Sequence, residues 1–274
     1  MEILELILNN NFLLYALIVG TLVALCASLL GTSLVLRRFS MIGDGLSHVA
    51  FGAVAIAAAL NAQPMYIALP IVIIAAFLLL QASENGKLAG DSAIALISTS
   101  ALAIGVLIAS VTSANIDLSS YLFGSILAIS KKDVPLSVIL CVAVLILFLF
   151  SYHKIFAVTF DESFAKATGV KTAFYNMLIA VLTAVTIVLG MRLMGAMLIS
   201  SFIIFPSLTS MRICKKFRQV IVLSAVLSCV SVIFGIIFSC LFDNMPTGAV
   251  IVCTNLVFYL IAALTGFIKD KSRK

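Results

Sequence analysis

A carboxylate and an imidazole stand four residues apart at the start of a long apolar segment, in the stretch Gly43-Asp44-Gly45-Leu46-Ser47-His48. If this segment is a helix, the side chains of Asp44 and His48 lie on one face. Ionisable groups at membrane depth are costly and mark ion or proton paths, and both groups are ligands for zinc, manganese and iron. The pattern therefore indicates a site for a divalent transition metal.

Two ligands from one chain are too few for a closed metal site. A symmetric homodimer with this helix on its axis would bring two Asp44 and two His48 side chains together as a roughly tetrahedral set of nitrogen and oxygen ligands. Two other interpretations stay open on the residues alone. Asp44 could cap the helix, and His48 could donate to a backbone carbonyl in a polar contact between helices.

The composition indicates the solvent in which these elements fold. Hydrophobic residues make up 63% of the chain and charged residues 10%, against roughly 45–50% and ~25% in soluble domains. We therefore expect a multi-pass integral membrane protein, with one membrane domain over residues 1–274. Met1 to Asn11 carries two acidic residues and no basic one, which is unlike a cleaved signal peptide, so the first apolar stretch is predicted to remain as a transmembrane helix.

Apolar windows of ~17–25 residues predict an all-α bundle of nine transmembrane spans. Eight is the alternative count, because the second window is short and the sixth and seventh are separated only by Gly190 to Arg192. The windows are Phe12 to Leu36, Ser47 to Leu60, Met65 to Gln81, Ala93 to Ser113, Val134 to Phe150, Phe174 to Leu189, Leu193 to Thr209, Val220 to Leu241 and Gly248 to Ile268.

The basic residues predict the orientation of these spans. With the N-terminus outside and the C-terminus in the cytoplasm, 14 of the 17 lysines and arginines fall on the cytoplasmic side, and only Lys131, Lys132 and Arg192 fall outside. An anionic lipid leaflet then accounts for the net charge of +6. No nucleic-acid partner is expected.

Two connections are long enough to hold structure of their own. On the outer side, the apolar stretch Tyr121 to Leu127 is too short to span and is expected to lie in or dip into the interface. On the inner side, Asp161 and Glu162 begin a predicted short helix that Gly169 ends. A cytoplasmic helix without a core of its own suits docking to a partner, although an ordinary solvated loop helix is the alternative.

Three further positions could shape a transport path, and two common enzyme motifs are missing. Arg192, at the predicted turn between the sixth and seventh spans, is either an interfacial anchor or part of an external gate. Pro206 should kink the seventh span, and Gly195 could allow close packing. The sequence contains neither a Gly-x-x-x-x-Gly-Lys-Ser/Thr phosphate loop nor His-Glu-x-x-His, so the chain is not expected to be an enzyme.

The stretch Leu30 to His48 resembles the signature of the metal-type ATP-binding-cassette (ABC) permeases, the membrane subunits of bacterial zinc, manganese and iron importers. It departs from the family pattern at Gly45 and Val49, where alanine is usual, and keeps Asp44 and His48. The similarity continues in Ser120 to Ala128, in Asp161 to Val170 and in Arg192 to Pro206, with Glu162 in place of the usual proline.

This resemblance implies a permease domain of the type II fold, like that of vitamin B12 importers, in a bacterial cell membrane. It implies a homodimer with cytoplasmic ABC ATPase subunits and an external metal-binding solute receptor. It implies that Asp44 and His48 hold the transported zinc or manganese ion transiently, without a permanent cofactor. It also implies that the segment of Asp161, Glu162, Phe164, Lys166 and Gly169 couples the permease to the ATPase. An ion-coupled secondary transporter is the alternative, and zinc is weakly preferred over manganese.

Overall fold

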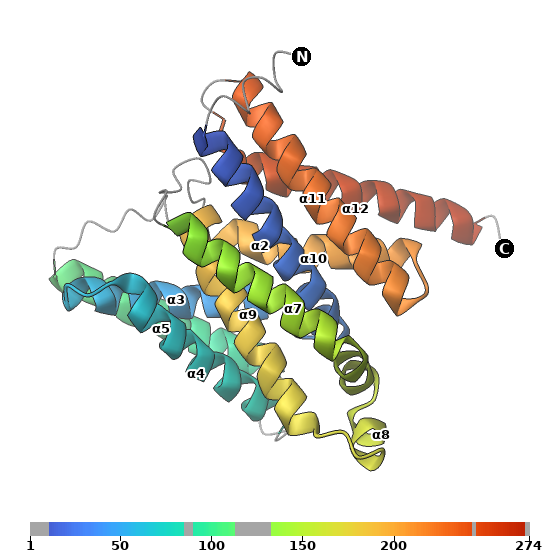
Figure 1. Ribbon diagram of the computed structural model, residues 1–274, viewed down its shortest axis with the longest axis horizontal. Helices are drawn as coiled ribbons and strands as arrows, with labels where there is room; N and C mark the ends of the chain where they lie inside the picture. Colours follow the sequence, from blue (N-terminus) through green and yellow to red (C-terminus); the bar gives the residue numbers. More distant parts are fainter. Residues whose placement is uncertain (1–10, 85–89, 113–132, 243–244, 272–274) are drawn as a thin grey trace.

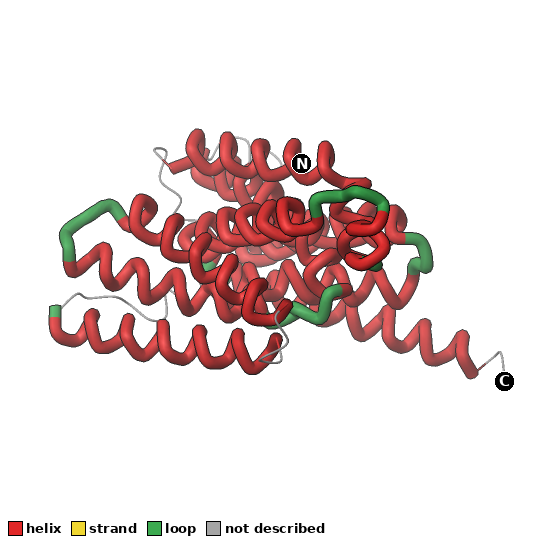
Figure 2. Tube along the Cα trace, turned by 90° about the horizontal axis from the view of Figure 1, so that it is seen from below, coloured by secondary structure: helices red, strands yellow, loops and turns green. Residues whose placement is uncertain are grey.

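The computed structural model describes residues 11–84, 90–112, 133–242 and 245–271. Within these ranges every regular element is an α-helix, as Figure 2 shows. The helices are α2 (Asn11–Leu36), α3 (Ile42–Ala59), α4 (Pro64–Glu84), α5 (Gly90–Val111), α7 (Asp133–Phe160), α8 (Glu162–Ala167), α9 (Thr172–Met194), α10 (Ala196–Ile213), α11 (Phe217–Leu241) and α12 (Thr247–Lys271).

Each of the nine predicted apolar windows corresponds to one of these helices. Among the described residues, eight helices are long and apolar enough to cross a membrane, and the apolar part of α4, Pro64–Leu79, is shorter. The second helix begins at Ile42, before the apolar window that starts at Ser47, so Asp44 lies in its first turn. The predicted outer segment Tyr121 to Leu127 lies outside the described residues.

The predicted position of the turn between the sixth and seventh spans is wrong. Helix α9 continues through Gly190 and Arg192 to Met194, and the chain breaks at Gly195, whose φ and ψ are 93° and 160°. Glycine adopts this backbone conformation without a Cβ clash, whereas other residues rarely do. Gly195 therefore separates α9 from α10 and is not part of the seventh span, while Pro206 lies inside α10.

Helix α2 lies at the centre of one half of the bundle. It contacts α7, α9, α10 and α11, and α12 packs on α10 and α11. The other half is formed by α3, α4 and α5, which lie together at the left of Figure 1. Helices α9 and α10 contact both halves, so they join the helix that carries Asp44 and His48 to the rest of the molecule.

Buried hydroxyl and amide side chains form hydrogen bonds between several helices. Ser228 of α11 donates to the hydroxyl of Ser28 of α2 across 3.1 Å. Asn255 of α12 accepts from Ser231 at 2.6 Å and donates to Ser201 at 3.3 Å. Such bonds stabilise the association of helices in a membrane, where the lipid is as apolar as the side chains and the hydrophobic effect does not drive association.

Helix α3 is held against α5 at a crossing made of two glycines. A Cβ built on Gly52 would lie 2.7 Å from the carbonyl oxygen of Ala101, and one built on Gly105 would lie 2.8 Å from the Cα of Gly52. The two backbones are therefore in direct contact. This contact fixes the position of the helix that carries the two candidate ligands.

We predict that Gly52→Ala destabilises the fold, because the added methyl group must displace the backbone of α5. Overpacking of this kind typically costs about 1–3 kcal/mol, and thermal unfolding in detergent should occur at a lower temperature than in the wild type. Gly266→Ala is the matched control, since no atom lies within 4 Å of a Cβ at that position. Equal unfolding temperatures for the two variants would contradict the close crossing.

Candidate metal site and associated elements

The connection from α2 to α3 is a short turn with its own hydrogen bonds. The amides of Arg38 and Phe39 donate to the carbonyls of Val35 and Leu34 at 3.0 and 2.9 Å. Arg38 has a φ of 64°, the left-handed conformation that commonly ends a helix. The amide of Ile42 then donates to Phe39 at 3.1 Å, so α3 starts directly after the turn.

Asp44 and His48 lie one turn apart on α3, as their spacing predicts. His48 Nε2 is 3.6 Å from Asp44 Oδ2, and the side chains are 21% and 47% exposed respectively. The N-cap residue of α3 is Met41 and makes no side-chain cap bond, so Asp44 does not occupy the N-cap position, and its carboxylate faces His48. Both groups are accessible enough to reach an ion together.

The residues on either side of Asp44 are packed against neighbouring helices. A Cβ on Gly43 would lie 2.8 Å from Ile203 Cδ1 of α10, and a Cβ on Gly45 would lie 2.5 Å from Ile94 Cγ2 of α5. Gly43 and Gly45 are therefore buried, while Asp44 between them stays half-exposed. Close packing sets the rotation of the helix and thereby the side on which its carboxylate projects.

The pair is an incomplete ligand set. Among the described residues, no group of three or more His, Cys, Asp and Glu side chains could hold a metal ion. A four-coordinate ion would need further ligands from water or from another chain.

Helix α8 forms where the acidic and glycine signals predict a short helix. Its N-cap Asp161 accepts a hydrogen bond from the amide of Phe164 at 2.9 Å. At its C-terminal end, Gly169 has a φ of 84° and its amide donates to Lys166 at 3.1 Å, a common glycine C-cap arrangement. Ala165 is buried, whereas Lys166 is exposed and Phe164 is 66% exposed, so α8 presents an aromatic side chain away from its own bundle.

A polar network that the sequence analysis missed lies beside α8. Arg37 Nη2 donates to Asn176 Oδ1 of α9 at 2.8 Å and to the carbonyl of Val158 of α7 at 2.9 Å. Asn176 Nδ2 in turn donates to Glu162 Oε1 of α8 at 3.0 Å. The sequence feature that could have indicated this network is Asn176, a single asparagine near the start of the window Phe174 to Leu189, because a polar side chain in an apolar segment needs hydrogen-bond partners.

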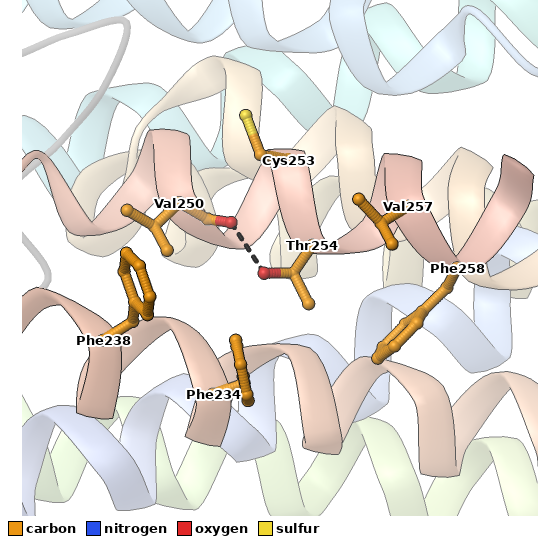
Figure 3. Close-up of a pocket in the computed structure, with 7 residues that line it drawn as sticks. All are labelled: Phe234, Phe238, Val250, Cys253, Thr254, Val257 and Phe258. Carbon is orange, nitrogen blue, oxygen red and sulfur yellow. Dashed lines mark hydrogen bonds between the residues drawn. The ribbon is translucent and has the colours of Figure 1, made fainter.

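Figure 3 shows an apolar groove between α11 and α12, away from the Asp44 and His48 pair in the chain. Its volume is about 320 Å³, and the hydroxyl of Thr254 donates to the carbonyl of Val250 at 2.9 Å. The lining contains no carboxylate and no imidazole, so it offers no comparable set of metal ligands. The lining residues are Phe234, Phe238, Val250, Cys253, Thr254, Val257 and Phe258.

The other predicted path residues lie on α9 and α10. Arg192 is an exposed residue in the last turn of α9, not in a turn between spans. Gly195 forms the break itself, and Pro206 is a buried residue of α10. The structure thus brings Asp44 and His48 together on α3. The candidate coupling residues lie on and beside α8, which Asn176 links to Arg37 at the end of α2.

Residues 9–266 match the ABC 3 transport family. The chain belongs to this family. The match covers nearly the whole chain, and it confirms the resemblance to metal-type ABC permeases that the residues from Leu30 to His48 carry.

Curated relatives from bacteria include proteins described as importers of two different metals. The high-affinity zinc uptake system membrane protein ZnuB of Buchnera aphidicola is 28% identical over 87% of this chain and 92% of its own length. The manganese import system permease protein ScaB of Streptococcus gordonii is 29% identical over 96% of this chain and 93% of its own length.

Solved structures share the fold. The structure of PsaBC from Streptococcus pneumoniae in complex with Fab matches with a TM-score of 0.83 and 30% identity, over 95% of this chain and 94% of that chain. An inward-facing structure described as a metal-chelate type ABC transporter matches with a TM-score of 0.72 at 15% identity, over 95% and 88% of the two chains, and this second likeness concerns the fold alone.

Together these findings establish the class of this ABC 3 protein. It is a multi-pass membrane protein and a transport subunit of the metal ABC permease type, and it is not itself an enzyme. The predictions of a membrane permease of the metal ABC type and of a cell-membrane location are confirmed.

Proposed function

We propose that this chain is the permease subunit of an ATP-driven importer for a divalent transition metal, with Asp44 and His48 as the ligands that hold the ion during passage. The observation that carries the proposal is the partly exposed pair on α3, with His48 Nε2 3.6 Å from Asp44 Oδ2. An ionisable pair inside a membrane segment is retained where an ion or water replaces lipid around it.

The incomplete ligand set suits transport rather than storage. An ion must bind well enough to enter and weakly enough to leave, and two protein ligands per chain give such a site. In a homodimer with α3 near the symmetry axis, two copies of each ligand would surround one ion tetrahedrally, which is the preferred geometry of zinc. On this ground we favour zinc, although relatives described as manganese importers are as similar to this chain as those described as zinc importers.

The proposed assembly contains partners on both faces of the membrane. Cytoplasmic ABC ATPase subunits would dock on α8, where exposed Phe164 and Lys166 are available, and an external solute receptor would deliver the metal. ATP binding and hydrolysis would alternate access to the site from the two sides, in a type II permease fold. The family membership supports this scheme over an ion-coupled secondary transporter.

Asp44→Ala and His48→Ala should each lower uptake of radiolabelled zinc and manganese by about tenfold or more, because loss of even an outer-shell partner of a metal ligand typically costs about 10–100-fold. Uptake is measured in cells with equal amounts of membrane-inserted protein, and dimer content is measured in detergent. His153→Ala is the matched control, because His153 is the second of the two histidines in the chain and lies exposed on α7. The control should transport normally.

Normal uptake by both Asp44→Ala and His48→Ala would remove the metal-site proposal. The transport class is tested separately in the wild type by removing the ATPase partner while the proton gradient is intact. Loss of uptake supports an ATP-driven importer, and continued uptake that stops when the proton gradient is dissipated supports a secondary transporter.

The proposed orientation has its own test, in a variant whose six native cysteines are replaced. A cysteine at Lys216, between α10 and α11, should react only with reagents that reach the cytoplasm, because basic residues gather on that side. A cysteine at Asn61, an exposed residue between α3 and α4, should react with an impermeant external reagent. The reverse pattern would invert the topology and would place α8 on the wrong side for an ATPase.

A further inference from the structure

The side chain of Arg37 lies at a junction of three helices. Arg37 follows the last residue of α2, and its Nη2 donates to the Val158 carbonyl of α7 at 2.9 Å and to Asn176 Oδ1 of α9 at 2.8 Å. Hydrogen bonds from a charged donor are shorter and stronger than neutral ones. The start of the α2–α3 connection is therefore anchored to both helices that flank α8 in the chain.

Asn176 extends this anchor to α8. Its side chain is only 4% exposed, and its amide nitrogen donates to Glu162 Oε1 at 3.0 Å while its oxygen accepts from Arg37. Both ends of one buried amide are thus bonded to side chains of opposite charge. A movement of Glu162 would disturb Arg37 through this single amide, because a buried polar group is costly to leave without a partner.

The connection between Arg37 and the candidate metal ligands is short and hydrogen-bonded. The amides of Phe39, Ile42 and Gly45 each donate to a backbone carbonyl, at 2.9, 3.1 and 3.0 Å. Helix α3 then carries Asp44 in its first turn. A displacement of Arg37 is therefore passed on to the start of α3 instead of being absorbed by a flexible loop.

We infer that Arg37 and Asn176 are positioning residues that transmit movement of α8 to the Asp44 and His48 pair. The inference rests on the proposed function, in which an ATPase moves α8. The connection runs from Glu162 to Asn176, then to Arg37, and then through the bonded turn to α3. Arg37 and Asn176 do not touch the ion in this scheme; they set how the site responds to the partner.

A static clamp with the same hydrogen bonds is the competing explanation, and only a coupling measurement separates the two. In Asn176→Asp, the carboxylate can still accept from Arg37, but it presents its second oxygen to Glu162 and repels it. Adding Glu162→Gln restores a donor to that oxygen, with the donor and acceptor exchanged. The pair of substitutions therefore breaks and then remakes one link at nearly constant volume.

The experiment uses the full permease with its ATPase partner in proteoliposomes. It measures zinc or manganese ions transported per ATP hydrolysed, together with ATPase co-purification and thermal unfolding. Asn176→Asp should lower the transport ratio by about fivefold or more, an interaction of the size found between contacting residues. The double variant Asn176→Asp with Glu162→Gln should regain a ratio within about twofold of the wild type.

Asn255→Ala is the matched control, since Asn255 is a buried amide that links α10, α11 and α12 without touching α8. It should lower the unfolding temperature and leave the transport ratio unchanged. A wild-type ratio in Asn176→Asp, a loss that Glu162→Gln does not repair, or an equal loss in Asn255→Ala would overturn the inference. Absence of ATP-driven transport of both zinc and manganese in the wild type would instead overturn the proposed function on which the inference rests.

Discussion

An apolar helix bundle can hold a carboxylate and an imidazole at membrane depth only where water, a partner or an ion replaces lipid around them. This constraint accounts for the arrangement of α3. Glycines at 43, 45 and 52 bring its backbone against α10 and α5, and this close packing leaves Asp44 and His48 on the accessible side of the helix. The position of the candidate ligand pair is consequently set by backbone contacts with α5 and α10.

The same constraint governs the polar side chains inside the bundle. Hydroxyls of serine and threonine bond to carbonyls of their own helices or to one another, as Ser28 and Ser228 do, and Asn255 bonds to a serine on each of two helices. Arg37 is charged, and it donates hydrogen bonds to residues of both α7 and α9. These bonds from a charged donor add to the packing of α2, α7 and α9, which already contact one another.

Much of the fold follows from the sequence because lipid exposure demands long apolar helices, and hydropathy reports these directly. The short helix α8 was equally predictable, since Asp161 and Gly169 are local cap signals. The break at Gly195 was misplaced because hydropathy stays high on both sides of it, and a positive φ leaves no mark on hydropathy. The bonds of Asn176 to Arg37 and Glu162 span 139 and 14 residues of chain, so they depend on the packing of α9 and could not be derived from local patterns.

The central claim is that two chains share one ion between their Asp44 and His48 side chains. X-ray absorption at the zinc edge of the purified homodimer, together with zinc stoichiometry, tests this directly. The account predicts one zinc ion for two chains, bound by nitrogen and oxygen ligands. The scattering contribution of the imidazole rings should be lost in His48→Ala. One zinc ion per chain, a sulfur shell, or an unchanged spectrum in His48→Ala would contradict it.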